Sequence, residues 1–263
     1  MSEETENTIA AIYRYPVKGL SPEKLDRTTL APGDCLPHDR RFAIALPTTH
    51  FDPEQPKWAP KTCFVMLMRD EALARLRIRY DDASETLVIK DAGREAVRGD
   101  LSTEAGRRAI ETFFQTFMVK GLRGAPKVLA APDAFRFTDS RQGFVSIINL
   151  ASIQVVEAMI GAPVDPLRFR ANLYVVGWAP WAELDLLGQT LETDSGVTLK
   201  VTARTERCAA TNVDPDTGVR DLDIPNTMRR HLGHADCGVY AKVLQGGRIQ
   251  EGDRLTAQAA ALV

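Results

Sequence analysis

Short runs of apolar and aromatic residues alternate with polar turns through the first part of the chain. Such runs occupy residues 8–15, 25–30 and 41–46, and each has the length of a single β-strand. Proline and glycine residues at 16–19 and 31–34 separate the runs, because the proline ring and the freedom of glycine both favour turns. Short strands punctuated in this way are typical of a β-barrel or a β-sandwich.

The next part of the chain predicts a hairpin followed by a helix. Residues 77–80 and 86–89 have strand-like patterns and are joined by the polar turn 81–84, which indicates a β-hairpin. From 103 to 119 the apolar residues recur at helical spacing, and Ser102 is placed to cap this helix. The aromatic residues of the helix fit packing against a sheet, so we assign them no cofactor role.

The second half of the chain also has more strand patterns than helix patterns. The apolar run 144–148 predicts a buried strand, and residues 150–160 predict a helix with Asn149 at its N-cap. We expect further strands at residues 173–176, 197–204, 208–213 and 239–244. The sequence therefore predicts a mostly β protein with a few helices.

Length and composition fit a soluble protein built from two modules. The chain has 263 residues, of which 44% are hydrophobic and 26% are charged, and this is long enough for one large or two small cores. Glycine and proline residues between 121 and 132 interrupt the chain. We place the boundary there, which gives modules at 1–122 and 123–263.

Charge and hydropathy exclude several classes of protein. A formal net charge of −2 argues against a non-specific nucleic-acid binder, which needs a basic excess. No apolar run approaches the length of a membrane span, and the acidic first residues differ from a signal peptide. We therefore expect a cytoplasmic protein without a membrane partner, whose thiols are reduced.

The candidate chemistry is concentrated around Cys208. This residue follows Arg207 at the end of a strand-like run, and a Pro/Gly turn follows at 214–218. An arginine beside a thiol stabilises the thiolate, which attacks electrophiles or binds soft metals. A buried and inert thiol is the simpler alternative, since most free cysteines pack in the core.

A second cluster of polar residues near the end of the chain allows a metal site. It consists of His231, His234, Asp236 and Cys237, and zinc could use these groups together with Cys208. No CxxC pair occurs, however, and the spacing is not that of a usual zinc site. A structural pair of His234 with Asp236, or a histidine proton donor, are the other interpretations.

Three segments in order carry a family resemblance. They are Tyr15-Pro16-Val17-Lys18-Gly19; Arg207-Cys208 with Thr211, Val213-Asp214-Pro215 and Thr217-Gly218; and Gly233-His234-Ala235-Asp236-Cys237-Gly238-Val239-Tyr240. Together they resemble the MOSC family, and in particular the amidoxime-reducing component and its bacterial relatives. The resemblance implies a β-barrel-like MOSC domain preceded by a smaller N-terminal β-barrel module.

The resemblance also implies a molybdenum cofactor, molybdopterin, and a set of residues that hold it. Cys208 takes the position of the molybdenum ligand and is the expected catalytic residue. The residues expected to bind the cofactor are Lys18, Arg40, Asn149, Arg170, Asn172 and Arg207. Arg41 follows Arg40, so these two could be exchanged. Glu206 departs from the serine of the relatives, and its carboxylate would repel an anionic cofactor unless it points away or pairs with an arginine.

By this resemblance the expected activity is oxygen removal from N-hydroxylated substrates. Electrons would come from a separate reductase or redox protein, because the sequence shows no site for a flavin, a haem or an iron–sulfur cluster. The alternative is a sulfur or cofactor carrier with a persulfide on Cys208. The chain is too short to contain a pyridoxal-phosphate sulfurase domain. The aromatic loop around Trp178 and Trp181 could rim a substrate pocket or simply pack.

Overall fold

The mostly β prediction is confirmed in a computed structural model of the protein. The structure describes residues 6–118, 122, 124–133, 135–140 and 145–258, and within these it contains fifteen strands and four α-helices. The strands are β1 (Thr8–Arg14), β2 (Glu23–Leu25), β3 (Arg27–Leu30), β4 (Phe42–Ala45), β5 (Arg77–Asp81), β6 (Thr86–Asp91), β7 (Arg94–Asp100), β8 (Lys127–Ala130), β9 (Val145–Asn149), β10 (Leu173–Val176), β11 (Thr190–Thr193), β12 (Thr198–Glu206), β13 (Asp236–Gln245), β14 (Gly247–Gln250) and β15 (Leu255–Gln258). The α-helices are α1 (Glu104–Phe117), α2 (Leu150–Ile160), α3 (Ala182–Asp185) and α4 (Ile224–Leu232), and the 3-10 helices are η1 (Lys61–Cys63), η2 (Glu71–Arg75), η3 (Pro166–Phe169) and η4 (Ala209–Asn212).

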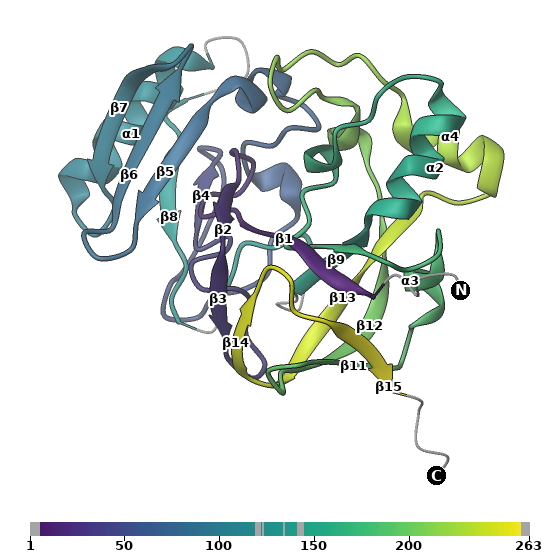
Figure 1. The fold of residues 1–263 in the computed structure, drawn as a ribbon. Helices are drawn as coiled ribbons and strands as arrows, with labels where there is room; N and C mark the ends of the chain where they lie inside the picture. The colour runs from purple at the N-terminus through teal and green to yellow at the C-terminus, as the bar shows by residue number, and fades with distance from the viewer. Residues whose placement is uncertain (1–5, 119–121, 123, 134, 141–144, 259–263) are drawn as a thin grey trace, which may run out of the picture.

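An eight-stranded sheet joins the start of the chain to its second half. Its strand order is β15-β11-β12-β13-β9-β10-β1-β2. Strand β1 pairs antiparallel with β10, with Ile12 opposite Leu173, and crosses the centre of the molecule in Figure 1. Because antiparallel strands place the end of one beside the start of the other, the loop after β1 lies next to the residues that precede β10.

A separate unit of sheet and helix occupies the left of Figure 1. It contains the antiparallel sheet β5-β6-β7 and helix α1, whose Ile110 and Phe114 are buried against it. The predicted hairpin and the aromatic packing are therefore confirmed. The predicted cap is wrong by one residue: Thr103 Oγ1 accepts a hydrogen bond of 3.0 Å from Gly106 N, whereas Ser102 bonds to Asp100. Residue 119, where we expected the helix to end, lies outside the described residues.

Two predicted strands are wrong. The run 25–30 forms two short strands, because β2 pairs with β1 whereas β3 pairs with β14 in a different sheet. The run 208–213 contains the 3-10 helix η4 instead of a strand, with Cys208 at its N-cap and Thr211 N bonded to Cys208 O. The expected strand 144–148 is β9, and residue 144 lies outside the described residues.

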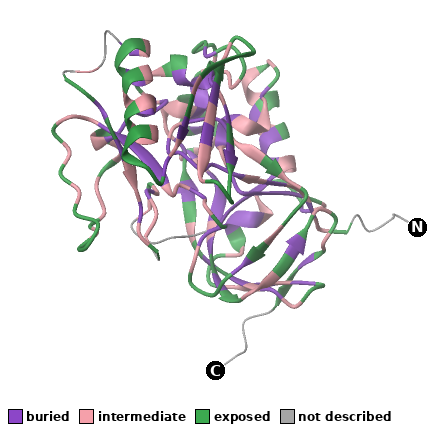
Figure 2. Ribbon diagram, turned by 90° about the vertical axis from the view of Figure 1, so that its left-hand side faces the viewer, coloured by how far each residue is buried: buried purple, intermediate pink, exposed green. Residues whose placement is uncertain are grey.

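Helices α2 and α4 cover one side of the large sheet and lie next to each other at the right of Figure 1. The predicted N-cap is confirmed, since the Asn149 side chain accepts a hydrogen bond from Ala151 N at 3.0 Å. Gly161 ends α2 in the left-handed conformation, with φ 74°. Figure 2 shows that the central strands are largely buried whereas the outer faces of the helices are exposed.

Candidate functional site

A polar cavity lies between the loop that follows β1 and the second half of the chain. Its volume is about 150 Å³. Its floor is formed by side chains of neighbouring strands, because Tyr240 stands opposite Ser146 and the Ser146 hydroxyl donates to Asn172 Oδ1 at 2.9 Å. The sheet therefore presents a polar surface to whatever binds above it.

Six of the seven residues predicted from the sequence line this one cavity. They are Lys18, Arg40, Arg170, Asn172, Arg207 and Cys208. They come from four distant segments of the chain. Including Asp39, Lys61, Asp139, Arg168 and Glu206, the lining holds six basic and three acidic side chains. The cavity is therefore cationic, although the whole chain is slightly acidic.

Two arginines of the cavity contact the ring of Tyr15, which is fully buried and does not itself line the cavity. The guanidinium carbons of Arg40 and Arg170 each lie 4.3 Å from the centroid of Tyr15. Both arginines have left-handed backbone, with φ of 49° and 53°, which is uncommon for residues other than glycine. Asp39 supports this arrangement by accepting hydrogen bonds from Tyr15 N at 2.7 Å and from the Arg40 guanidinium at 2.5 Å.

The two arginines differ in their charge partners. Burial disfavours the charge of Arg40, but Asp39 overcomes this and raises the pKa of Arg40. Burial lowers the pKa of Arg170, and the neighbouring charge of Arg40 adds to this effect. The Arg170 guanidinium makes neither a hydrogen bond nor an ion pair with any described residue. An anionic ligand would relieve that imbalance.

Lys18 is almost fully buried and stands beside the arginines. Its ammonium group donates to Phe137 O at 3.0 Å and forms an ion pair with Asp139. Burial lowers the pKa of Lys18, and Asp139 opposes this shift. The chain therefore carries its own carboxylate against the lysine that we expected to bind the cofactor.

Arg207 is held by the backbone next to Cys208. Its guanidinium donates to Cys237 O and to Phe169 O, both at 2.7 Å, so the side chain is buried and fixed. Its remaining nitrogen, Nη2, is buried without a hydrogen-bond partner among the described residues. Arg207 thus ties the segment before Cys208 to β13 and η3.

Cys208 lines both this cavity and a second one. The second cavity, about 320 Å³, shares Lys61, Glu206, Arg207 and Cys208 with the first. The Cys208 side chain is partly exposed, so the alternative of a buried, inert thiol does not describe its position. The Glu206 carboxylate pairs with Arg229 at 3.0 Å. Because an arginine neutralises it, this carboxylate is compatible with an anionic ligand in the cavity.

The structure gives Asn149 a different place from the one expected. It does not line the cavity: its amide donates to Ala179 O at 2.8 Å and to Glu183 Oε2 at 3.3 Å while it caps α2. Glu183 is fully buried, and burial raises its pKa although its hydrogen bonds oppose the shift. Asn149 therefore belongs to a buried polar cluster behind the site.

The structure separates two neighbouring arginines. Arg40 lines the cavity, whereas Arg41 does not and instead pairs with Glu85 at 2.7 Å. Trp178 is buried in the core of the large sheet, so the aromatic loop packs there and is not part of the rim of the cavity.

The cluster at residues 231–237, which the sequence offered as a possible metal site, makes local contacts. His234 Nδ1 accepts a hydrogen bond from Asp236 N at 3.0 Å. Cys237 is buried, and burial raises the pKa of its thiol to about 12. Within the part of the chain that the structure describes, no three His, Cys, Asp or Glu residues gather closely enough to hold a metal ion.

Sequence reasoning missed several residues of the cavity. Asp139 lies in an irregular segment with no pattern of its own, and Lys61 reaches the cavity from η1. Tyr240 was part of the family resemblance, but only the pairing of β13 with β9 shows that it faces the site. Arg168 also lines the wall, where Asp221 at 2.8 Å and Asp214 at 3.1 Å neutralise it.

Comparison with protein families agrees with this architecture. The MOSC N-terminal beta barrel domain matches residues 6–124, and the MOSC domain matches residues 132–256. The chain is therefore a member of the MOSC-domain proteins, a family in which some members bind a molybdenum cofactor. No curated protein matches the sequence.

Two solved structures are similar to this chain. The YUAD protein from Bacillus subtilis has 13% identity and a TM-score of 0.44, over 95% of this chain and 93% of its own. YiiM from Geobacillus stearothermophilus has 20% identity and a TM-score of 0.36, over 45% of this chain and 55% of its own. Within the described residues, no helix combines the length and the apolar character that a membrane span requires.

Proposed function

We propose that the cationic cavity binds a pterin-based molybdenum cofactor, with Cys208 as the protein ligand of the metal. The observation that carries the proposal is that a partly exposed thiol and the basic groups of Lys18, Arg40 and Arg170 line the same cavity. A thiolate is a suitable ligand for a soft metal, and guanidinium and ammonium groups bind phosphate. The Arg170 guanidinium, which has no described counter-ion, is the best candidate to contact the phosphate.

The chain's own residues then have separate tasks. Arg40 and Arg170 orient the phosphate from their fixed positions beside Tyr15, and Lys18 adds a third positive charge. Arg207 places Cys208 and contributes positive charge beside the thiolate. When bound, the cofactor would supply two-electron redox chemistry at the metal.

We further propose that the protein reduces N-hydroxylated substrates with electrons from a separate redox partner. Support comes from the second cavity, which is also lined by Cys208 and is bordered mainly by polar groups. A small polar substrate would approach the metal through that cavity. The Glu206–Arg229 pair at this cavity offers both an acceptor and a donor to such a substrate.

Metal and pterin content test the first part of the proposal. The wild type, Cys208→Ala and Cys63→Ala would be produced in a host that makes the cofactor, then analysed for molybdenum and pterin. Cys63 is a matched control, because it is also partly exposed but does not line the cavity. We expect near-stoichiometric molybdenum in the wild type and Cys63→Ala, and loss of molybdenum in Cys208→Ala.

The opposite result would support the alternative of a carrier. Wild-type protein that holds neither molybdenum nor pterin, and that carries a persulfide on Cys208, would overturn the proposal. If the metal is bound, reduction of an amidoxime with a chemical electron donor tests the activity. Metal-loaded protein without turnover would contradict the reductase function while leaving cofactor binding intact.

A further inference from the structure

The Glu183 carboxyl of helix α3 is buried beside the large sheet. Its residue has an exposed fraction of 0%, and α3 packs against β9 and β13 at this point (Figure 1). A buried carboxylate is costly unless it pairs with a cation or accepts hydrogen bonds. Among the described residues no basic side chain forms an ion pair with Glu183, so hydrogen bonds must stabilise the group.

Three donors from three other elements point at this carboxyl. On Oε2, it accepts from Ser152 Oγ at 2.8 Å and from Asn149 Nδ2 at 3.3 Å. On Oε1, it accepts from Gly238 N at 3.3 Å. The Ser152 hydroxyl itself accepts from Trp181 N, which leaves its proton for the carboxyl. A group with two acceptor oxygens fits this set, whereas an amide, which has one, does not.

Gly238 connects this carboxyl to Arg207. The residue before Gly238 is Cys237, whose carbonyl oxygen accepts from Arg207 Nε at 2.7 Å. The guanidinium also lies against Gly238 itself, because a Cβ atom there would be 2.8 Å from Arg207 Nη2. Arg207 therefore rests on the same short stretch of backbone whose amide group is held by Glu183.

The bonds of Arg207 matter for Cys208 because the strand ladder is irregular just before it. The pairing of β12 with β13 shifts its register between Arg204 and Glu206, so regular pairing does not continue up to Cys208. The Arg207 guanidinium attaches this segment to β13 and, through a bond of 2.7 Å to Phe169 O, to η3. The place of the thiol thus depends on where the guanidinium is held.

We propose that Glu183 is a positioning residue for Cys208. By accepting from Gly238 N, the carboxylate fixes the backbone of β13, and this backbone holds the Arg207 guanidinium beside the thiol. The inference rests on the proposed function only for its consequence at the metal, since the contacts that carry it lie within the chain. Asn149, which does not line the cationic cavity, takes part through its bond to Glu183.

The Arg207 Nε–H signal in a nitrogen–proton NMR correlation spectrum of cofactor-free protein tests the proposal. Its absence from the spectrum of Arg207→Lys identifies it. In Glu183→Gln, the single amide oxygen can serve the two donors at Oε2 only if the NH₂ group faces Gly238 N, so that bond is lost. We expect the Arg207 signal to shift and its proton to exchange with solvent about tenfold faster.

Ser152→Ala separates positioning from a general loss of stability. It removes a hydrogen bond to Oε2 but leaves Oε1 on Gly238 N. The Arg207 signal should therefore stay as in the wild type even where the melting temperature falls. An equal change of this signal in Ser152→Ala and Glu183→Gln would overturn the proposal.

Glu157→Gln is the matched control. Glu157 also accepts from a backbone amide, that of Val164 at 2.9 Å, but lies at an exposed position of α2. An Arg207 signal that is the same in Glu183→Gln as in this control would contradict the proposal. A measurement on the wild type needs no variant: a Gly238 amide that exchanges freely while Arg207 Nε–H stays protected would also contradict it.

Molybdenum content measures the consequence at the metal. After loading with cofactor, Glu183→Gln should retain about tenfold less molybdenum than Glu157→Gln, because groups that orient a metal ligand commonly contribute this much to affinity. Equal content in the two variants would overturn the role of Glu183 at the metal. Wild-type protein without molybdenum would overturn the proposed function instead, and the Arg207 signal, measured without cofactor, tests this inference separately.

Discussion

The Arg40 guanidinium donates a hydrogen bond of 3.1 Å to the backbone carbonyl of Arg170, although the two residues lie 130 positions apart. Both side chains also contact the ring of Tyr15. The bond joins the loop before β4 to the segment before β10, and the pairing of β1 with β10 brings Tyr15, the residue after β1, close to the second of these segments. The arrangement of the two arginines around Tyr15 therefore depends on the way the first strand inserts into the large sheet.

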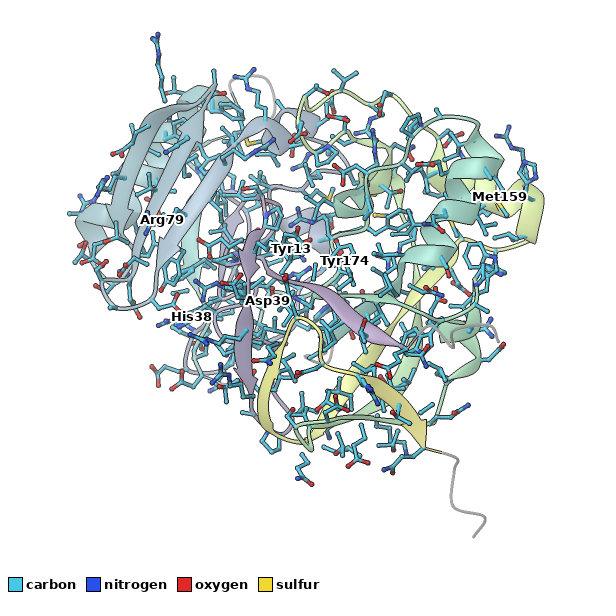
Figure 3. The ribbon with its side chains drawn as sticks, in the orientation of Figure 1. Tyr13, His38, Asp39, Arg79, Met159 and Tyr174 are labelled. Atoms are coloured by element: carbon cyan, nitrogen blue, oxygen red, sulfur yellow. The ribbon has the colours of Figure 1, made fainter. Side chains whose placement is uncertain are left out.

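Replacement of Arg170 should weaken cofactor binding more than any loss of surface charge does. In Arg170→Gln we expect the pterin content to fall about tenfold or more, because a charge-assisted contact with phosphate is lost. Arg79→Gln is the control, since Arg79 is exposed on β5 (Figure 3) and does not line the cationic cavity. Pterin fluorescence of the purified proteins measures the effect. Equal pterin content in the two variants would contradict the assigned role.

A side chain at Gly238 should displace the Arg207 guanidinium. A Cβ atom at Gly238 would lie 2.6 Å from Ile147 O and 2.8 Å from Arg207 Nη2, and its φ is 80°. We expect Gly238→Ala to lower the melting temperature and to reduce cofactor content. Gly233→Ala is a matched control, because Gly233 has the same φ of 80° with no atom within 4 Å. The positive φ alone costs about 1–2 kcal/mol, so the control measures that strain. Equal melting temperatures in the two variants would show that the close contacts are unimportant.

The buried carboxyl of Glu183 should give stability a recognisable pH dependence. Burial raises its folded pKa above the ordinary 4.5, so its contribution is complete below pH 4.5 and is lost as the pH rises through the folded pKa. As the pH rises from 4.5 through the folded pKa of Glu183, we expect the unfolding free energy of the wild type to fall relative to that of Glu183→Gln, whose side chain cannot ionise. Denaturant titrations at a series of pH values compare the two slopes. Parallel slopes would indicate that the folded pKa of Glu183 is not raised.

The Asp139 carboxylate should compete with anionic ligands for Lys18. Its carboxylate pairs with Lys18 in the cationic cavity, so Asp139→Asn leaves the lysine free to bind a ligand. We expect inorganic phosphate to bind the cofactor-free variant about fivefold tighter, the order of a weakly screened ion pair. Asp133→Asn, at an exposed position of the same segment, should leave affinity unchanged. Weaker phosphate binding in Asp139→Asn would show that Asp139 supports the site instead.

Much of the fold was predictable from local patterns. The hairpin, the helices α1 and α2 and the strand β10 follow periodicity and capping, which act over a few residues. The two wrong strands have non-local causes. Residues 25–30 change from one sheet to another, and the chain after Cys208 turns into η4 because its backbone groups bond within the segment.

The candidate site was predictable only through the resemblance. The basic residues expected to bind the cofactor lie at positions 18, 40, 170 and 207, and no local pattern unites them. The resemblance could not separate residues that line the cavity from residues that support it, so Asn149 was misplaced and Asp139 was missed. Both errors depend on side-chain directions, which the pairing of distant strands determines.

X-ray absorption at the molybdenum edge would test the central claim most directly, namely that Cys208 binds the metal while the basic residues hold the pterin. Cys208→Ser, in which a hydroxyl replaces the thiol, would be compared with the wild type after loading both with cofactor. The account predicts that the variant retains pterin and that its metal has one sulfur ligand fewer than in the wild type. The same number of sulfur ligands in both proteins would contradict it.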